Sequence, residues 1–365
     1  ARSMNAPPVE RATILFQMGR VLSALRRIEE AIATLDDAAV LAETSEETRV
    51  LLPRIELLKA LTLNRGGRTQ AALLTGERAV ASARVIFGAD HERTASALST
   101  VGGMLRHTGQ LDRAEGMLRE AYAIGQRNYG QARPAVVNNL ALLMETRGNL
   151  VEAESVQTEA LNLAEAYYGR DSAASARYRR NLGLIQAWRG DWEQALSNLT
   201  QALNIHQADA GAEDNYTLFM RSQLAWARLQ AGQIDAVRES LPALLQRLPT
   251  LRESNPRTAI WIHMLAAELS LHNSDGQTAR AHSDAIGGLL DNADITLSNW
   301  EQVYTALVES LANSAVAAEE PPTEQWQDLL ELSQRLLGVD HPLRIRVESV
   351  AAARGLTGIE KAETS

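Results

Sequence analysis

The chain has 365 residues, of which 45% are hydrophobic but only 4% aromatic, and it contains no cysteine. The lack of cysteine excludes disulfides and thiolate metal sites. The net charge of −9 disfavours a general nucleic-acid binder, because contacts with phosphate call for an excess of basic residues. We find no apolar run as long as a membrane span and no charged-then-apolar leader. These features predict a cytoplasmic protein that binds neither nucleic acid nor membrane.

The spacing of apolar residues and turns predicts helices along almost the whole chain. In chain order we expect them at 9–24, 27–43, 46–64, 68–86, 92–107, 111–128, 133–147, 151–168, 172–188, 192–207, 214–230, 234–247, 256–272, 277–291 and 297–313. Two more helices, at 323–337 and 342–354, are expected after Pro321-Pro322. Residues 1–8 are expected to be disordered or vector-derived, and residues 356–365 are expected to be a disordered tail.

Two interleaved series of glycines divide these helices into repeating units. The first series marks short turns spaced by 42, 39, 42 and 42 residues: Gly67, Gly109, Gly148, Gly190 and Gly232. The second series runs half a period out of phase with the first: Gly88, Gly130, Gly169 and Gly211. Each unit therefore reads as a helix, a glycine turn, a second helix and a looser turn.

Small residues recur at fixed distances from the first glycine series, where the two helices of a unit have to cross closely. Seven residues before these glycines lie Ala60, Gly102, Ala141, Gly183 and Ala225. Five residues after them lie Ala72, Ala114, Ala153 and Ala195. The register extends upstream through Gly19 and weakens beyond about residue 255.

A small residue, a glycine turn and two alanines in this register resemble the tetratricopeptide repeat. The long unit is similar to the variety found in kinesin light chains and bacterial multidomain regulators. The resemblance is carried by Asn138-Asn139-Leu140-Ala141 ahead of Arg147-Gly148 and by the turns Phe87-Gly88-Ala89-Asp90-His91 and Leu337-Gly338-Val339-Asp340-His341-Pro342.

This resemblance implies an all-α, right-handed superhelical solenoid of antiparallel helix pairs. We expect six hairpins within 9–254, followed by degenerate hairpins and a capping helix within 255–355. A cap is expected because the last apolar face of a solenoid would otherwise meet water.

No motif points to catalysis. Neither of the two lysines follows a glycine, which excludes a P-loop, and there is no Gly-x-Ser-x-Gly elbow or His-Glu-x-x-His pair. We therefore predict a protein that is not an enzyme and has no cofactor or metal site. His91 and His341, which each follow an aspartate in a turn, are interpreted as structural parts of a helix start.

In such a solenoid the first helix of each pair lines a concave groove, and one stripe of it faces the groove. On this acidic chain the stripe is rich in arginine. The predicted partner-binding residues are Arg65, Arg106, Asn138, Arg177, Arg180, Asn181, Trp188 and Trp226. Arginine binds carboxylates in a bidentate manner, and tryptophan offers a large apolar area. Two alternatives stay open: the arginines pair with nearby glutamates, and the tryptophans pack against the next unit.

These observations predict an interaction module that holds a partner protein or peptide with acidic and apolar side chains in its groove. The alternative is the C-terminal sensor or autoregulatory arm of a larger signalling enzyme, such as a kinase, or of a transcriptional regulator. Reading of single-stranded RNA by helical repeats is disfavoured by the acidic charge. The sequence leaves homo-oligomer formation open and does not indicate it.

Overall fold

The computed structural model describes residues 6–292, 295, 297–316 and 323–356. These residues form nineteen α-helices and no strand, which confirms the all-α prediction. The first ten are α1 (Pro8–Ala24), α2 (Ile28–Ala42), α3 (Glu46–Arg49), α4 (Leu52–Arg65), α5 (Thr69–Phe87), α6 (Glu92–His107), α7 (Leu111–Tyr129), α8 (Pro134–Arg147), α9 (Leu150–Tyr168) and α10 (Ala173–Arg189). The others are α11 (Trp192–Ala210), α12 (Asn215–Gln230), α13 (Ile234–Leu245), α14 (Leu248–Ser254), α15 (Pro256–His272), α16 (Gly276–Asn292), α17 (Asn299–Val316), α18 (Thr323–Leu336) and α19 (Pro342–Ala352).

Two helices differ from the sequence-based expectation. The single helix expected at 46–64 is interrupted at Val50 and Leu51, and α4 starts anew with Pro53 in its first turn. The missing N–H of proline costs nothing in a first turn, where no intrahelical acceptor exists. The short α14 was not expected, and it too has a proline, Pro249, in its first turn. Of the predicted disordered ends, residues 1–5 and 357–365 lie outside the described residues.

The chain divides into two compact units, and the boundary lies within α8. Unit 1 runs up to Leu140, and unit 2 runs from Ala141 to Ala293 and again from Leu297 onward. The division at 254/255 that the sequence suggests is a different one and stays a prediction. None of the helices in the described part of the chain is long and apolar enough to cross a membrane.

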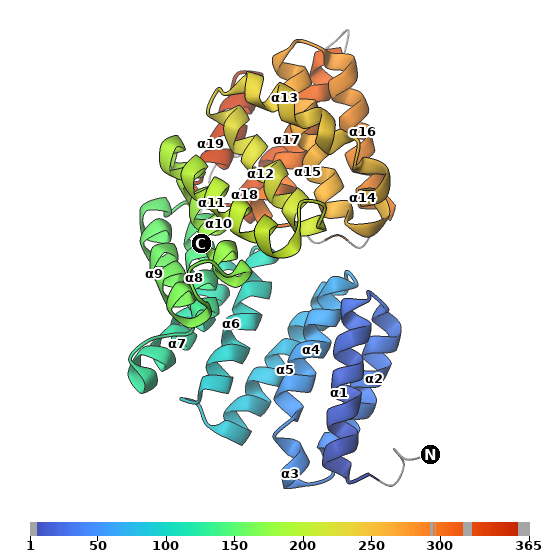
Figure 1. Ribbon diagram of the computed structural model, residues 1–365, viewed down its shortest axis with the longest axis vertical. Coiled ribbons are helices and arrows are strands. Elements are labelled where there is room, and N and C mark those ends of the chain that lie inside the picture. Colours follow the sequence, from blue (N-terminus) through green and yellow to red (C-terminus); the bar gives the residue numbers. More distant parts are fainter. Residues whose placement is uncertain (1–5, 293–294, 296, 317–322, 357–365) are drawn as a thin grey trace. The chain divides into compact units, whose positions relative to one another are not determined.

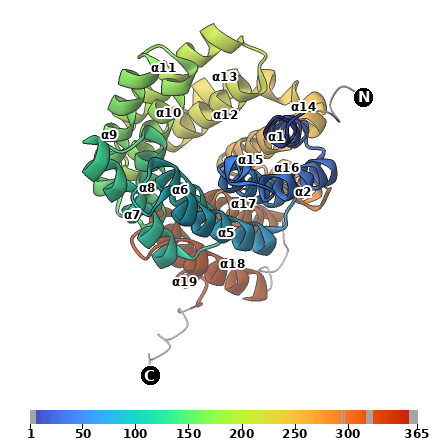
Figure 2. The ribbon, with the colours of Figure 1, turned by 90° about the horizontal axis from the view of Figure 1, so that it is seen from below.

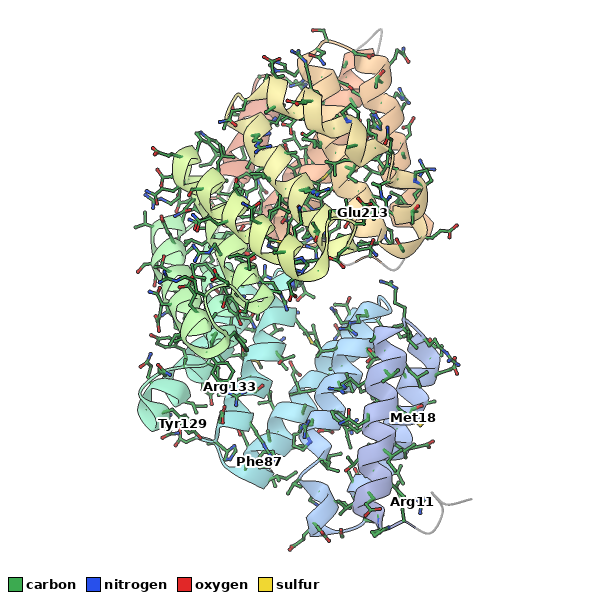
Figure 3. The ribbon with its side chains drawn as sticks, viewed as in Figure 1. Arg11, Met18, Phe87, Tyr129, Arg133 and Glu213 are labelled. Atoms are coloured by element: carbon green, nitrogen blue, oxygen red, sulfur yellow. The ribbon has the colours of Figure 1, made fainter. Side chains whose placement is uncertain are left out.

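Unit 1 contains the helical hairpins α1/α2, α4/α5 and α6/α7, which pack side by side (Figure 1), together with the short α3 and the first half of α8. The predicted small residues lie at the crossings: Ala60 and Ala72 are fully buried, and a Cβ on Gly102 would come within 2.7 Å of Leu118. All nine glycines of the two series have positive φ, between 69° and 95°, a conformation that glycine adopts without strain. Some large apolar side chains nevertheless remain exposed, among them Met18 on α1 (Figure 3).

Unit 2 contains the hairpins α10/α11, α12/α13 and α15/α16, followed by α17, α18 and α19. Figure 2 shows the helices from α10 to α17 following one another around an arc. The end of the chain returns to the end of α8, where the N–H of Gly338 donates to the carbonyl oxygen of Thr146 at 2.9 Å. The last helices therefore fold back onto the earlier helices of unit 2.

Candidate functional site

The candidate site lies on the first helices of the hairpins in unit 2. We call the surface formed by Arg180, Trp188, Phe219, Trp226 and Trp261 the inner wall; it belongs to α10, α12 and α15. Helix α10 is fixed at both ends. Its first turn is capped by the Ser172 hydroxyl, which accepts from the N–H of Ser175 at 3.1 Å, and it ends at Gly190 with φ of 82°.

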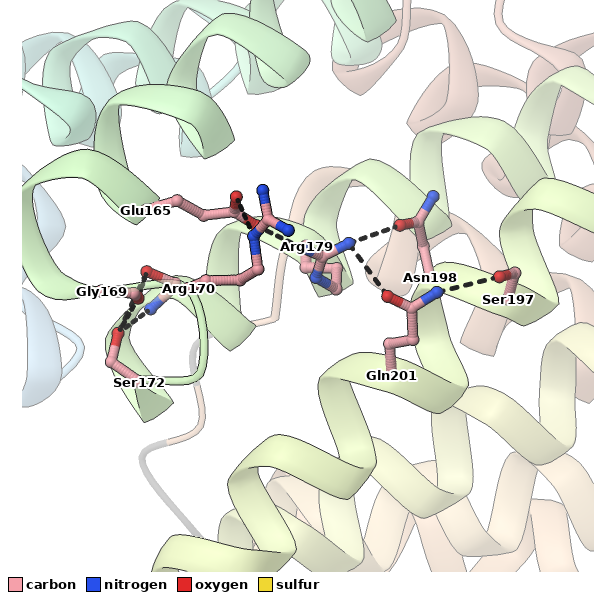
Figure 4. A network of polar contacts seen from close by, with 9 residues as sticks. Glu165, Gly169, Arg170, Ser172, Arg179, Ser197, Asn198 and Gln201 are labelled. Atoms are coloured by element: carbon pink, nitrogen blue, oxygen red, sulfur yellow. Dashed lines mark hydrogen bonds and ion pairs between the residues drawn. The ribbon is translucent and has the colours of Figure 1, made fainter.

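Successive arginines of α10 point in different directions, and Arg179 turns away from the inner wall. Its guanidinium pairs with Glu165 on α9 and donates to Asn198 at 3.3 Å and to Gln201 at 3.2 Å on α11 (Figure 4). The terminal nitrogens of Arg179 thus join α10 to its two neighbouring helices, and the side chain serves a structural role.

Arg180 faces the next hairpin instead. Its guanidinium carbon lies 5.7 Å from the ring centre of Tyr216 and 5.4 Å from that of Phe219, within the range of cation–π contacts. One terminal nitrogen donates to the Asn181 side-chain oxygen at 2.6 Å. Among the described residues no carboxylate pairs with Arg180, and its Nε has no hydrogen-bond partner. Arg177, one turn earlier on the same face, is exposed.

Arg257 of α15 contacts the same ring, with its guanidinium carbon 5.1 Å from the centre of Phe219. Unlike Arg180, it holds a carboxylate in bidentate fashion: its Nε and Nη2 donate to Glu301 at 3.2 and 2.6 Å. Glu301 is almost fully buried and also accepts from the Trp261 indole at 2.6 Å and from the N–H of Ser298 at 2.7 Å. Its oxygens are therefore occupied without Arg180.

The site has more arginines than carboxylates, and the pKa values reflect this excess of positive charge. Burial lowers the pKa of Arg180 below its usual value; the positive charges of Arg257 and Arg177 act in the same direction, and Tyr216 and the charge of Glu301 oppose them. Burial acts to raise the pKa of Glu301, but Arg257, Ser298 and Trp261 together hold it below its usual value. Guanidinium groups stay protonated in proteins, so Arg180 lies near two other cations, Arg177 and Arg257, while the nearby carboxylate of Glu301 is already held by Arg257. We call Arg177, Arg180, Asn181 and Arg257 the arginine patch; it is suited to a further carboxylate.

The two predicted tryptophans lie deeper in unit 2. Trp226 is 2% exposed, and its indole N–H donates to the Tyr304 hydroxyl of α17 at 3.0 Å. The ring centre of Trp188 lies 5.1 Å from that of Trp226, 5.3 Å from that of Trp300 and 5.2 Å from that of His341. Both tryptophans thus pack inside the unit, as in the alternative interpretation, and a partner reaches Trp226 only if α17 moves.

The remaining three predicted residues belong to unit 1. Arg65 donates to the Ser23 hydroxyl at 3.0 Å, and Arg106, 6% exposed, lies 3.1 Å from the His107 ring nitrogen. Asn138 is half-buried on α8. These three residues belong to unit 1, and the other five predicted residues belong to unit 2. That all eight line one groove therefore stays a prediction.

His91 and His341 are structural, as predicted, although the capping atom is not the expected one. In each case the His Nδ1 accepts from the backbone N–H two residues on, at 3.0 Å for Arg93 and 3.1 Å for Leu343. The histidine, and not the preceding aspartate, therefore caps the helix. Within the described residues no group of three or more His, Asp or Glu side chains could hold a metal ion.

The sequence reasoning missed Tyr216, Phe219, Arg257 and Glu301. Phe219 had a usable signal, since it lies 42 residues after Arg177 and therefore in the same column of the repeat. Arg257 and Glu301 had none, because the residues 42 positions before them, Asn215 and Ala259, carry no charge.

Comparison with known proteins tests the resemblance to the tetratricopeptide repeat. Residues 51–127 match the family model described as tetratricopeptide repeat. None of the curated proteins with which the sequence was compared matches it.

Several solved structures share the fold. A Rap protein complexed with competence and sporulation factor matches with a TM-score of 0.57 and 11% identity, covering 95% of this chain and all of that one. A tetratricopeptide repeat protein from Parabacteroides merdae ATCC 43184 matches with a TM-score of 0.54 and 13% identity, covering 82% of this chain and 98% of the other. BtubC (BKLC) from P. vanneervenii matches with a TM-score of 0.46 and 23% identity, covering 56% of this chain and 85% of its own length. The resemblance to the tetratricopeptide repeat is thus confirmed: residues 51–127 match its family model, and the solved structures share the fold, whereas the 42-residue, kinesin-light-chain-like variety stays a prediction.

Proposed function

We propose that this protein is an interaction module that holds a partner protein or peptide on unit 2, with a partner carboxylate on the arginine patch. The observation that carries the proposal is Arg180. It is a half-buried cation between two aromatic rings, and no carboxylate of the described residues pairs with it. Burying an unpaired charge is costly, so a carboxylate supplied from outside would recover energy that the folded chain leaves unused.

The surroundings define the chemistry of the partner. Arg177 is exposed and Tyr216 is half-buried, so this end of the inner wall can be reached from solvent. The Trp226 end is covered by α17. We therefore place the partner across the first turns of α10 and α12, with an acidic side chain on Arg180 and an apolar side chain against Tyr216. A purely apolar partner would leave the arginines unpaired.

The test is selection of peptides from a random displayed library on the purified protein, followed by fluorescence anisotropy with the selected peptide. We expect enrichment of Asp and Glu next to apolar residues. Loss of a charge-assisted hydrogen bond costs about 1.5–3 kcal/mol, so Arg177→Ala/Arg180→Ala should weaken binding roughly 10- to 100-fold.

A matched control is Arg238→Ala on α13. Arg238 is exposed and paired with Asp235, and its loss should leave affinity unchanged. Selected peptides without acidic residues, or full affinity in a correctly folded double variant, would remove the assignment to the arginine patch. No observation in the structure favours the alternative of an autoregulatory arm of a larger enzyme or regulator, and a cytoplasmic location stays a prediction.

A further inference from the structure

The arginine patch carries two positive charges that no carboxylate of the described residues neutralises. Arg177 is exposed and forms no ion pair in this part of the chain, and Arg180 donates only to the uncharged side chain of Asn181. Arg257 adds no net charge, because Glu301 accepts from it in bidentate fashion. Since guanidinium groups stay protonated, the patch offers both uncompensated charges to a bound group.

The acidic residues closest to the start of α12 are engaged elsewhere. Glu213, which precedes α12 (Figure 3), pairs with Arg247 at 2.8 Å. Asp214 caps α12, where one of its oxygens accepts from the N–H groups of Tyr216 and Thr217 at 2.8 and 3.0 Å. The first turns of α10, α12 and α15 contain no acidic residue, whereas those of α9, α11 and α13 each contain one. An anion at the start of the wall helices therefore meets no acidic residue of their first turns, and the helix dipoles attract it.

We propose that the arginine patch binds a phosphate monoester of the partner, carried by a phosphorylated side chain, more tightly than it binds a carboxylate. The inference rests on the proposed function, because the same residues hold an anionic group of the same kind of partner. A carboxylate brings one negative charge and two oxygens, which a single guanidinium can saturate. A phosphate monoester brings a charge of about −1.5 to −2 at pH 7 and three acceptor oxygens, which matches two arginines.

The spacing of Arg177 and Arg180 allows both to reach one phosphate. They lie three residues apart on α10, and residues at this spacing share a face of the helix with Cβ atoms roughly 5–6 Å apart. Asn181 and the rings of α12 hold Arg180 in place, whereas the exposed Arg177 can turn toward it. Two successive acidic side chains of a partner would also bring two charges, but they point to opposite sides of an extended peptide. A single dianion therefore fits the patch better.

The test uses three synthetic peptide libraries with random flanking positions and with serine, glutamate or phosphoserine at a fixed central position. The tightest sequence retained by the purified protein is then made with each of the three central residues and measured by fluorescence anisotropy. We expect the phosphoserine form to bind roughly tenfold or more tighter than the glutamate form, as one additional charge-assisted hydrogen bond would give. The serine form should bind more weakly than both.

Arg177→Ala tests the charge count. The variant should bind both acidic forms more weakly, and the advantage of the phosphoserine form should disappear, because Arg180 alone saturates a carboxylate but not a phosphate. Arg238→Ala, a change at an exposed arginine of α13 that pairs with Asp235, should leave all three affinities unchanged.

The outcomes separate this inference from the proposed function. A phosphoserine form that binds no tighter than the glutamate form, or an advantage that persists in Arg177→Ala, would overturn the inference and leave the acidic partner in place. Absence of binding by both acidic forms would overturn the two proposals together. Inorganic phosphate, added as a competitor, should displace the phosphoserine peptide far less effectively than the unlabelled peptide does. Equal displacement would assign the patch to a free anion and overturn the phosphorylated partner.

Discussion

The return of the chain to the end of α8 depends on Gly338, and its replacement by alanine gives a sharp test of the fold of unit 2. The N–H of Gly338 donates to Thr146 at 2.9 Å, and a Cβ on Gly338 would overlap the carbonyl of Arg147. Since the obstacle is backbone and not a flexible side chain, the turn at 337–341 has to withdraw in Gly338→Ala.

The expected loss of stability in Gly338→Ala has two parts, a lost hydrogen bond and a steric overlap. A lost hydrogen bond costs about 1 kcal/mol, and overpacking a close contact costs about 1–3 kcal/mol. We therefore expect the free energy of unfolding to fall by about 2–4 kcal/mol in total. Withdrawal also moves His341 away from Trp188, whose ring centre lies 5.2 Å from it, so tryptophan fluorescence should change.

The glycine turn that follows α8 supplies an internal control. Gly148 and Gly190 are equivalent turn glycines with φ of 86° and 82°. A Cβ on Gly148 would overlap the backbone of Asp340 and His341, whereas a Cβ on Gly190 meets nothing within 4 Å. Both alanine variants share the cost of a left-handed backbone, about 1–2 kcal/mol, so the excess loss in Gly148→Ala reports the contact with the C-terminal turn.

The assay is urea unfolding monitored by tryptophan fluorescence and circular dichroism. An excess of about 1–3 kcal/mol for Gly148→Ala over Gly190→Ala supports the contact. Equal losses in these two variants, together with an unchanged Gly338→Ala, would refute it.

Three further outcomes are expected. His263 and His282 lie with their Nδ1 atoms 3.0 Å apart, and burial first, then the charge of His282, lowers the pKa of His263 from 6.5 to about 4. The unfolded chain therefore binds this proton more tightly, so the contribution of His263 to stability should be lost as pH drops from about 6.5 to about 4, by at most about 3 kcal/mol. Unfolding as a function of pH should show a smaller slope over this range in His263→Gln. Glu301→Gln should lower the free energy of unfolding in urea by about 3 kcal/mol, the lower end of the range for a broken buried ion pair. The low value is expected because Arg257 is 41% exposed and can turn to solvent. A loss below about 1 kcal/mol would contradict the pairing. Arg179→Ala should cost about 2 kcal/mol by removing charge-assisted bonds to α9 and α11, and an unchanged melting curve would argue against this anchor.

The repeat itself could be predicted because its causes are local. A turn that needs positive φ selects glycine, and a close helix crossing selects alanine or glycine, so both features appear as periods in the sequence. The buried Ala60 and Ala72 and the left-handed Gly67 follow from these two rules alone.

The fold-back of the last helices could not be predicted in this way. Gly338 and Thr146 are 192 residues apart, and nothing in their local sequence names the other as a partner. The same holds for Glu301, whose partner Arg257 lies on α15. Where the repeat register drifts, the periodic argument loses its reference, so the residues that complete the site are the ones it missed.

One column of the repeat shows why the arginine patch lies where it does. Arg177, Phe219 and Trp261 are spaced by 42 residues and occupy equivalent positions on α10, α12 and α15. Along this column the side chain changes from an exposed cation to a phenyl ring 5% exposed and then to an indole that is fully buried and bonded to Glu301 of α17. The degenerate C-terminal helices thus cover the apolar end of the inner wall and stop short of its charged end. Covering Arg180 without a carboxylate would leave its charge unpaired, and this is why we propose that an acidic partner binds at this end of the inner wall.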